Sequence, residues 1–228
     1  MTGPSLVWVT RAEPGASRTA GRLRETGWTP VVCPLLAIRP LPQPAPDLDD
    51  CAAIAFTSIN GVAAFAALTP RRDRRVLTVG DATAGAARDA GFADVVSANG
   101  SVSDLVNLVS RAMHPHERLL AAVAKEPVAD LVRLLTGRVR VETVSVYEAV
   151  ETGVHAPESI DAIMIHSPRA AVALAALGPQ AFEGRLIVAI SEQAAVPLND
   201  LSAVDLRIAD HPSETGMLEA LGKPAPGV

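Results

Sequence analysis

Short apolar runs alternate with longer alanine-rich segments along the chain, and a polar corner separates each run from the segment that follows it. The clearest case is residues 54–62, where an apolar run passes through Thr57 and Ser58 into an alanine-rich stretch. The pattern returns at residues 163–172, with a histidine, a serine and a proline at the corner. A short apolar run bounded by polar residues is typical of a buried parallel strand. A hydroxyl at its end can cap the next helix.

The order of these elements predicts an α/β fold with two domains, because strands alternating with helices favour doubly wound parallel sheets. Residues 51–147 hold five expected strands, whereas the chain before them holds two and the chain after them three. We therefore expect an inserted domain of residues 51–147 and a discontinuous domain of residues 1–37 and 154–228, both flavodoxin-like with five strands. Residues 38–50, rich in proline and therefore extended, and residues 148–153 form a two-stranded linker. Such a hinge would leave a cleft between the domains.

Composition excludes several classes of function. Aromatic residues make up only 3% of the chain and the net charge is −5, which argues against binding of nucleic acids through base stacking or phosphate contacts. The two cysteines, Cys33 and Cys51, lack metal-ligand spacing and are expected to be reduced thiols. No apolar run approaches membrane-spanning length and no signal pattern opens the chain. We expect a cytoplasmic protein with no membrane or nucleic-acid partner.

Small polar residues stand at or near the ends of most expected strands, where open α/β sheets bind their ligands. Hydroxyls and helix N-terminal N–H groups suit carboxylates and phosphates. Each serine or threonine could equally serve only to cap its helix, but the repetition in both halves favours an anion site. The candidate binding residues are Arg11, Thr57, Ser58, Asn60, Gly80, Thr83, Ser101, Lys125, His166, Ser167, Ser191, Gln193 and Ser213.

Familiar catalytic motifs are absent from the sequence. It contains no dinucleotide-binding glycine pattern, no Walker-type phosphate loop and no nucleophile elbow. His114 and His116 fall in an expected loop, so we expect no metal site. His166, at a strand end, is the one histidine with a case for function. The residues indicate an anion-binding cleft without an evident acid–base pair.

Five short motifs follow one another over nearly the whole chain. They are Val9-Thr10-Arg11, Phe56-Thr57-Ser58-x-Asn60-Gly61-Val62, Val79-Gly80-Asp81-Ala82-Thr83-Ala84, Val144-Ser145-Val146-Tyr147 and Ser167-Pro168. Their order, their spacing and their fit to the two-domain plan resemble the uroporphyrinogen-III synthase family of tetrapyrrole (heme) biosynthesis.

The resemblance implies a cofactor-free hydro-lyase acting on hydroxymethylbilane, a linear tetrapyrrole with eight carboxylate arms. Loss of its hydroxyl as water gives an azafulvene, and a spiro intermediate then recloses with the last pyrrole ring inverted. Positioning of this flexible chain should matter more than a strong base. Tyr147 matches the tyrosine that is the family's favoured candidate to assist departure of the hydroxyl; otherwise it is a linker tyrosine that packs one domain on the other. Arg11, Ser58, Thr83 and Ser167 match family positions around the cleft.

Three departures from the family pattern keep other functions open. Ser191-Glu192-Gln193-Ala194 replaces a Gly-Pro-Thr-Thr-like corner, Lys125-Glu126 an Arg-Gly pair, and His166 a threonine. The added Glu192 would repel a polyanion. A non-catalytic relative, using the cleft as a tetrapyrrole- or anion-binding regulatory module, is therefore the alternative; a two-domain sugar- or amino-acid-binding protein fits the motif order poorly. The expected protein is a monomer that meets its small-molecule substrate and, transiently, neighbouring pathway enzymes.

Overall fold

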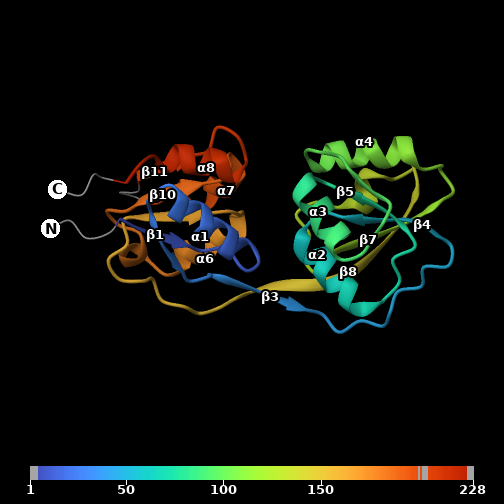
Figure 1. The fold of residues 1–228 in the computed structure, drawn as a ribbon, viewed down its shortest axis with the longest axis horizontal. Coiled ribbons are helices and arrows are strands. Elements are labelled where there is room, and N and C mark those ends of the chain that lie inside the picture. Colours follow the sequence, from blue (N-terminus) through green and yellow to red (C-terminus); the bar gives the residue numbers. More distant parts are fainter. Residues whose placement is uncertain (1–4, 200, 202–204, 225–228) are drawn as a thin grey trace. The chain divides into compact units, whose positions relative to one another are not determined.

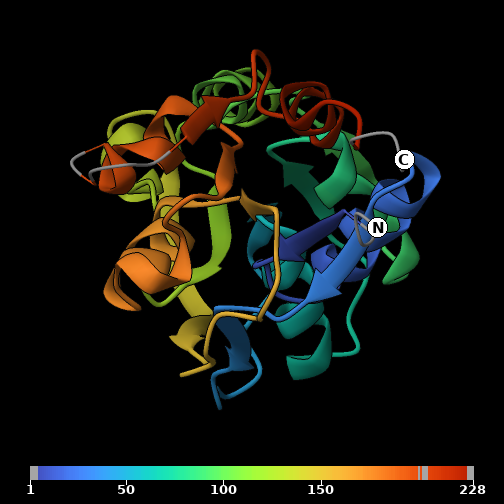
Figure 2. The same cartoon turned by 90° about the vertical axis from the view of Figure 1, so that its left-hand side faces the viewer.

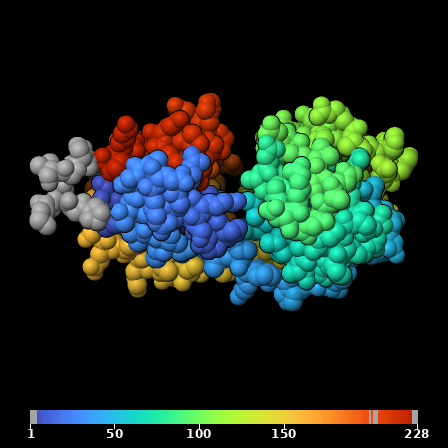
Figure 3. Space-filling model, viewed as in Figure 1, coloured from blue at the N-terminus to red at the C-terminus, as the bar shows by residue number. Residues whose placement is uncertain are grey.

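The computed structural model describes residues 5–199, 201 and 205–224 (Figure 1). The chain divides into two compact units: Met1–Ala37 with Val150–Val228, and Ile38–Ala149. In the space-filling view, segments from early in the sequence (blue) and from late in the sequence (red) lie in the same unit (Figure 3).

The first unit contains a sheet of five parallel strands in the order β11-β10-β9-β1-β2. Its elements are β1 (Leu6–Val9), α1 (Gly15–Glu25), β2 (Thr29–Val32), β9 (Ala162–Ile165), α6 (Pro168–Ala176), η1 (Pro179–Ala181), β10 (Leu186–Ala189), α7 (Glu192–Ala195), η2 (Val196–Leu198), β11 (Asp205–Ile208) and α8 (Glu214–Leu221). Alternate strand residues enter two core clusters: Trp8 packs with α6 and α7, and Val7 and Val9 pack with α1 and α8. Helices of this unit lie on both faces of its sheet (Figure 2). Burial on both faces explains the continuous apolar runs.

The second unit contains a six-stranded sheet in the order β3-β8-β7-β4-β5-β6. Its elements are β3 (Leu36–Pro40), β4 (Cys51–Phe56), α2 (Ile59–Leu68), β5 (Arg75–Thr78), α3 (Asp81–Asp89), β6 (Val95–Ser97), α4 (Val102–Ala112), β7 (Arg118–Ala124), α5 (Leu131–Leu134) and β8 (Arg140–Glu151). The pairs from β8 to β6 are parallel. One core cluster packs with α2 and α3, and the other with α4 and α5. The prediction of an α/β fold with parallel sheets is confirmed.

The prediction of five strands in each sheet is wrong for the second unit. β3 pairs beside β8, and β8 continues to Glu151, so regular strand occupies part of both stretches that were expected to be linkers. The prolines favoured the interpretation as an irregular connector. A proline can nevertheless end an edge strand, because its missing N–H faces no partner there, and Pro40 does so in β3.

Candidate functional site

The chain reverses its direction of strand addition at one place in each sheet. In the second unit β5 and β6 follow on one side of β4, and β7 and β8 lie on the other. In the first unit β2 lies on one side of β1, and β9, β10 and β11 lie on the other. In open α/β sheets, ligands bind beyond the carboxyl ends of the strands at such a reversal. Arg11, Ser58, Lys125, His166 and Ser167 directly follow the strands that flank the two reversals or lie within two residues of them.

Ser58 and Tyr147 form a hydroxyl pair in the second unit. Ser58 Oγ lies 2.9 Å from Tyr147 Oη, and it also accepts a hydrogen bond of 3.0 Å from the backbone N–H of Gly61. The second bond caps α2 at its N-terminus. Tyr147 is only 9% exposed. A hydroxyl has one proton and two lone pairs, so Ser58 can accept from Gly61 and still donate to the phenol oxygen.

A β-bulge aims Tyr147 at Ser58. Ser145 pairs with Val123, but Tyr147 pairs with Ala124, so Val146 is the extra residue in β8. Strand residues otherwise alternate between faces, yet Val146 and Tyr147 both pack in the cluster that contains α2. Bulges are frequent beside active sites because they redirect a side chain. Without this bulge, the alternation would place Tyr147 on the α4 face, away from Ser58.

Two cations share one carboxylate next to Tyr147. Glu148 Oε1 accepts from Arg39 Nε at 2.8 Å, and Oε2 accepts from Lys125 Nζ at 3.0 Å. These hydrogen bonds, first from Arg39 and then from Lys125, hold the pKa of Glu148 below its usual value. The side chain of Glu148 is 13% exposed, whereas both cations are largely exposed. The group carries a net charge of about +1 and can attract an anion.

A second charged group lies at the reversal of the first unit. Arg11 Nη1 is 3.2 Å from Glu214 Oε2, and His166 Nε2 is 3.4 Å from the same oxygen. Thr10 Oγ1 donates to the carbonyl of Met164 at 2.6 Å and ties β1 to β9 beside them. Burial lowers the pKa of His166, although Glu214 opposes this. Burial alone would raise the pKa of Glu214, but His166, Thr19 and Arg11 outweigh it, so that pKa lies below its usual value.

All four remaining serine candidates cap helices, as the simpler interpretation expected. Ser167, Ser191, Ser213 and Ser101 accept from backbone N–H groups of α6, α7, α8 and α4 at 3.2, 3.3, 3.1 and 3.3 Å. Ser101 also donates to Asp104 in a reciprocal capping box. It follows β6, four strands away from β8 in the sheet, which is roughly 19 Å at the usual strand spacing. The structure does not bring Ser101 together with Tyr147.

The other candidates lie close to the reversals. Thr57 and Asn60 are half-buried on either side of Ser58. Gly80 is the N-cap of α3, which follows β5, and Thr83 is buried in the first turn of that helix. Gln193 is an exposed residue of α7.

Sequence reasoning missed Arg39, Glu148 and Glu214. The first two fell in the expected linkers. Glu214 directly follows Ser213, a named candidate, and an acidic residue in the first turn of a helix is ordinary. His166 could have indicated that an acidic residue such as Glu214 lies nearby. A histidine that replaces a small hydroxyl residue at a buried strand end requires a polar partner.

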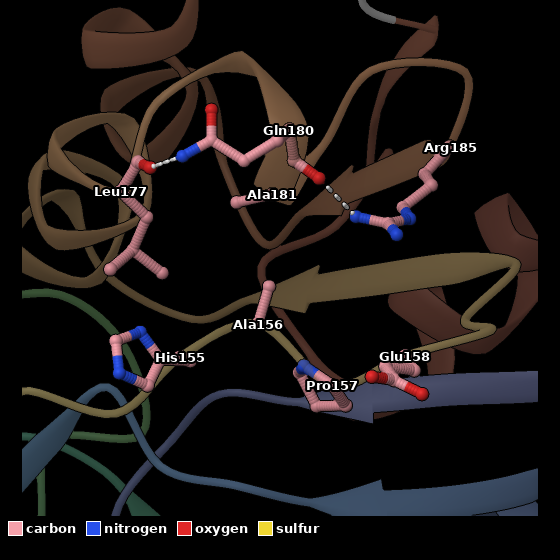
Figure 4. A pocket seen from close by; sticks show the side chains of 8 residues that line it. All are labelled: His155, Ala156, Pro157, Glu158, Leu177, Gln180, Ala181 and Arg185. Carbon is pink, nitrogen blue, oxygen red and sulfur yellow. Dashed lines mark hydrogen bonds between the residues drawn. The ribbon is translucent and has the colours of Figure 1, made fainter.

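A surface cavity of about 280 Å³ lies elsewhere in the first unit (Figure 4). It is lined by His155, Ala156, Pro157, Glu158, Leu177, Gln180, Ala181 and Arg185. Glu158 and Arg185 precede β9 and β10, so the cavity lies toward the amino ends of these strands and contains none of the candidate residues. Within the part of the chain that the structure describes, no cluster of acidic, histidine or cysteine side chains could hold a metal ion. No described helix has the length and hydrophobicity needed to cross a bilayer.

Comparisons with known proteins converge on one family. The model of the family described as uroporphyrinogen-III synthase HemD matches residues 17–219. A crystal structure of uroporphyrinogen-III synthetase from Helicobacter pylori is 20% identical over 95% of this chain and 97% of its own, with a TM-score of 0.64. That of a mutant uroporphyrinogen III synthase from the extremely thermophilic bacterium Thermus thermophilus is 16% identical over 96% and 97%, with a TM-score of 0.56. At these identities the structural likeness shows a shared fold. A comparison with curated proteins finds no match. Because the family model covers most of its length, the chain belongs to the uroporphyrinogen-III synthase family.

Proposed function

We propose that Tyr147 assists the loss of the hydroxyl group in the reaction of this synthase, which cyclises hydroxymethylbilane to uroporphyrinogen III with inversion of the last pyrrole ring. The synthase activity follows from membership of the family. The observation that supports the role of Tyr147 is its hydrogen bond with Ser58, at 2.9 Å, beside a reversal of the sheet. Each unit offers a cation that can bind a substrate carboxylate at its own reversal: Arg11 in the first unit and Lys125 in the second.

The first step breaks the C–O bond of the hydroxymethyl group. Tyr147 Oη donates its proton to the departing hydroxyl, which leaves as water, and the substrate becomes a cationic azafulvene that keeps its pyrrole N–H. The phenolate then accepts a hydrogen bond from Ser58 Oγ–H. Ser58 is held for this by the N–H of Gly61, and the N-terminus of α2 favours negative charge nearby. Lys125 and Arg39 add positive charge at the same strand ends.

The later steps depend on the conformation in which the substrate is held and require no further acid. The substituted carbon of the last pyrrole attacks the azafulvene carbon and forms the spiro intermediate, which fragments and recloses at the other carbon of that ring. The reclosed ring loses one proton, and this proton returns to Tyr147, so one water molecule is released per turnover. Held carboxylate arms restrict the substrate to the conformation that closes in this way.

A direct assay separates this function from the alternative of a non-catalytic binding module. The protein is mixed with freshly generated hydroxymethylbilane, the products are oxidised, and the type I and type III isomers are separated. Type III product above the spontaneous type I background is the expected result. Type I alone, from folded protein that binds the linear tetrapyrrole saturably, would favour the regulatory module and refute the proposal.

The proposal also covers the fold class of each domain, the location of the protein in the cell and its partners. The first sheet, with strands in the order 2-1-3-4-5 within its own unit, supports a flavodoxin-like domain. The second sheet follows 3-2-1-4-5 when β3 is set aside, and we class it only as doubly wound. We further propose a cytoplasmic location and transient contact with neighbouring pathway enzymes, which a small, reactive tetrapyrrole substrate favours.

A further inference from the structure

Arg11 lies against the glycine at the start of α1. A Cβ atom on Gly15, the first residue of α1, would lie 2.3 Å from Arg11 Nε and 2.6 Å from Arg11 Cζ. The guanidinium therefore rests directly on the backbone at the start of α1. This contact restricts the side chain on one side, although Arg11 remains 30% exposed.

Glu214 holds the same guanidinium on another side. Its Oε2 atom is 3.2 Å from Arg11 Nη1, and its side chain is 22% exposed. His166 lies behind the carboxylate with its Nε2 atom 3.4 Å from that oxygen and only 5% of its side chain exposed. Since burial lowers the pKa of His166, the imidazole stays neutral near pH 7. Among the described residues neither imidazole nitrogen has a hydrogen-bond partner, so His166 packs behind the carboxylate without adding charge.

A carboxylate at this place requires an explanation, because the substrate is itself a polyanion and Glu214 repels it. Burial lowers the pKa of Arg11, and repulsion from the nearby cation Arg18 of α1 lowers it further, whereas attraction to Glu214 raises it. The pKa of Arg11 therefore lies below its usual value. Removing Glu214 would raise the positive charge available to the substrate. Its presence therefore favours a role in which the orientation of Arg11 matters more than the size of the charge.

We propose that Glu214, backed by His166, is a positioning residue that fixes Arg11 in the orientation that receives a substrate carboxylate. The inference rests on the proposed function, specifically on Arg11 as a carboxylate-binding residue. A guanidinium has five N–H donors, and only Nη1 donates to Glu214 among the hydrogen bonds of the described residues. The other donors keep the paired geometry that a carboxylate needs for bidentate binding. An arginine fixed in advance loses less side-chain freedom when the substrate binds.

The test uses Glu214→Ala and Glu214→Gln in the full chain, with Glu219→Ala as a matched control. Glu219 is an exposed glutamate of the same helix, so its variant removes a like charge without touching Arg11. We expect Glu214→Ala to raise KM for hydroxymethylbilane about tenfold while kcat changes less than about threefold. Glu214→Gln, whose amide oxygen still accepts from Arg11, should raise KM only two- to threefold. Glu219→Ala should leave both constants unchanged.

The Arg11→Ala background distinguishes an effect of Glu214 that acts through Arg11 from a general effect on the structure. There, adding Glu214→Ala should leave KM unchanged or lower it, because no guanidinium remains to be held. An equal tenfold rise in both backgrounds would overturn the proposal, since Glu214 would then act without Arg11. A fall in KM for Glu214→Ala in the presence of Arg11 would also overturn it, because Glu214 would then only neutralise charge.

A measurement on the free protein makes failure of this inference distinguishable from failure of the proposed function. The Arg11 Nε–H signal, followed by ¹⁵N NMR without substrate, should be ordered in the wild type and in Glu219→Ala but mobile in Glu214→Ala. A rigid signal in Glu214→Ala would refute positioning whatever the activity. A wild type that makes no type III product would refute the proposed function while the order of Arg11 is still measured.

Discussion

Replacing Tyr147 with phenylalanine isolates the hydroxyl group to which we assign the proton transfer. The ring stays in its buried position, and only the 2.9 Å contact with Ser58 is lost. One hydrogen bond contributes roughly 0.5–1.5 kcal/mol net to stability. Ser58 keeps its bond from Gly61, so α2 remains capped. We therefore expect the free energy of unfolding to fall by no more than about 1.5 kcal/mol.

The effect on turnover should be much larger than the effect on stability. A positioned general acid contributes about 10²–10⁴-fold to a rate. Positioning of the substrate still operates in the variant, so we expect the lower end of that range. A hundredfold fall in kcat corresponds to about 2.7 kcal/mol of activation free energy. KM should change less than about twofold, because we assign the phenol to the transition state and not to the binding of carboxylates.

The assay follows the formation of the type III isomer from fresh hydroxymethylbilane and compares it with urea unfolding of the same preparation. Ser58→Ala should lower kcat about tenfold, since it removes the donor to the phenolate. In the Tyr147→Phe background, Ser58→Ala should lower kcat no further, because residues that act as a unit are not additive. Unchanged kcat in Tyr147→Phe, with folded protein, would remove Tyr147 from the mechanism. Fully additive losses would mean that the two hydroxyls act separately.

Three more predictions concern the bulge, the buried histidine and the glycines. Deletion of Val146 removes the extra residue but leaves Tyr147 opposite Ala124, on the face of the sheet that α2 covers. Type III formation per folded molecule should therefore stay well above that of Tyr147→Phe, as it should in Val146→Ala, which keeps the bulge; a fall of the deletion variant to the level of Tyr147→Phe would refute the argument. The pKa of His166 is lower in the folded chain than in the unfolded chain, so the unfolded chain takes up the proton first as the pH falls below about 6.5, and the free energy of unfolding decreases in that range. In His166→Gln, chemical unfolding should show a smaller decrease of this free energy between about pH 7.5 and 5.5. A decrease equal to that of the wild type would contradict the assignment. Gly216→Ala should lower the free energy of unfolding by about 1–3 kcal/mol, because the added Cβ would lie 2.5 Å from the carbonyl oxygen of His211. Gly21→Ala is the control: its added Cβ would have no atom within 4 Å, so it should be neutral or stabilising in thermal unfolding.

The sequence predicted those parts of the fold that depend on local pattern. Strands buried on both faces appear as continuous apolar runs, so β4, β7, β9 and β10 were visible. β3 was not, because the prolines that follow it suggest an irregular connector and only its pairing with β8 makes it a strand. Pattern cannot show pairing between distant segments, which depends on the whole sheet.

The site divides in the same way. A polar corner after a strand is readable, and Ser58 and Ser167 could be named from it, although the same residues also cap helices. The resemblance to the family pointed to Tyr147, but its direction depends on a bulge defined against β7. The pairing of His166 with Glu214 joins residues that lie far apart in the sequence and that no local rule connects. Charges brought together by tertiary structure are the part that the sequence could not supply.

In both charged groups, around Glu148 and around Glu214, one carboxylate pairs with the cations beside it. This arrangement helps to explain how an acidic protein can bind a polyanion. Glu148 pairs with Lys125 and Arg39, and Glu214 pairs with Arg11. Each carboxylate reduces the local positive charge, so neither group is arranged for maximum attraction. For a flexible substrate that would otherwise close without inversion, the selectivity of the reaction depends on where its arms are held, and a held cation defines that position better than a mobile one. The net charge of −5 is therefore compatible with the function, because orientation of a few cations matters more than their total.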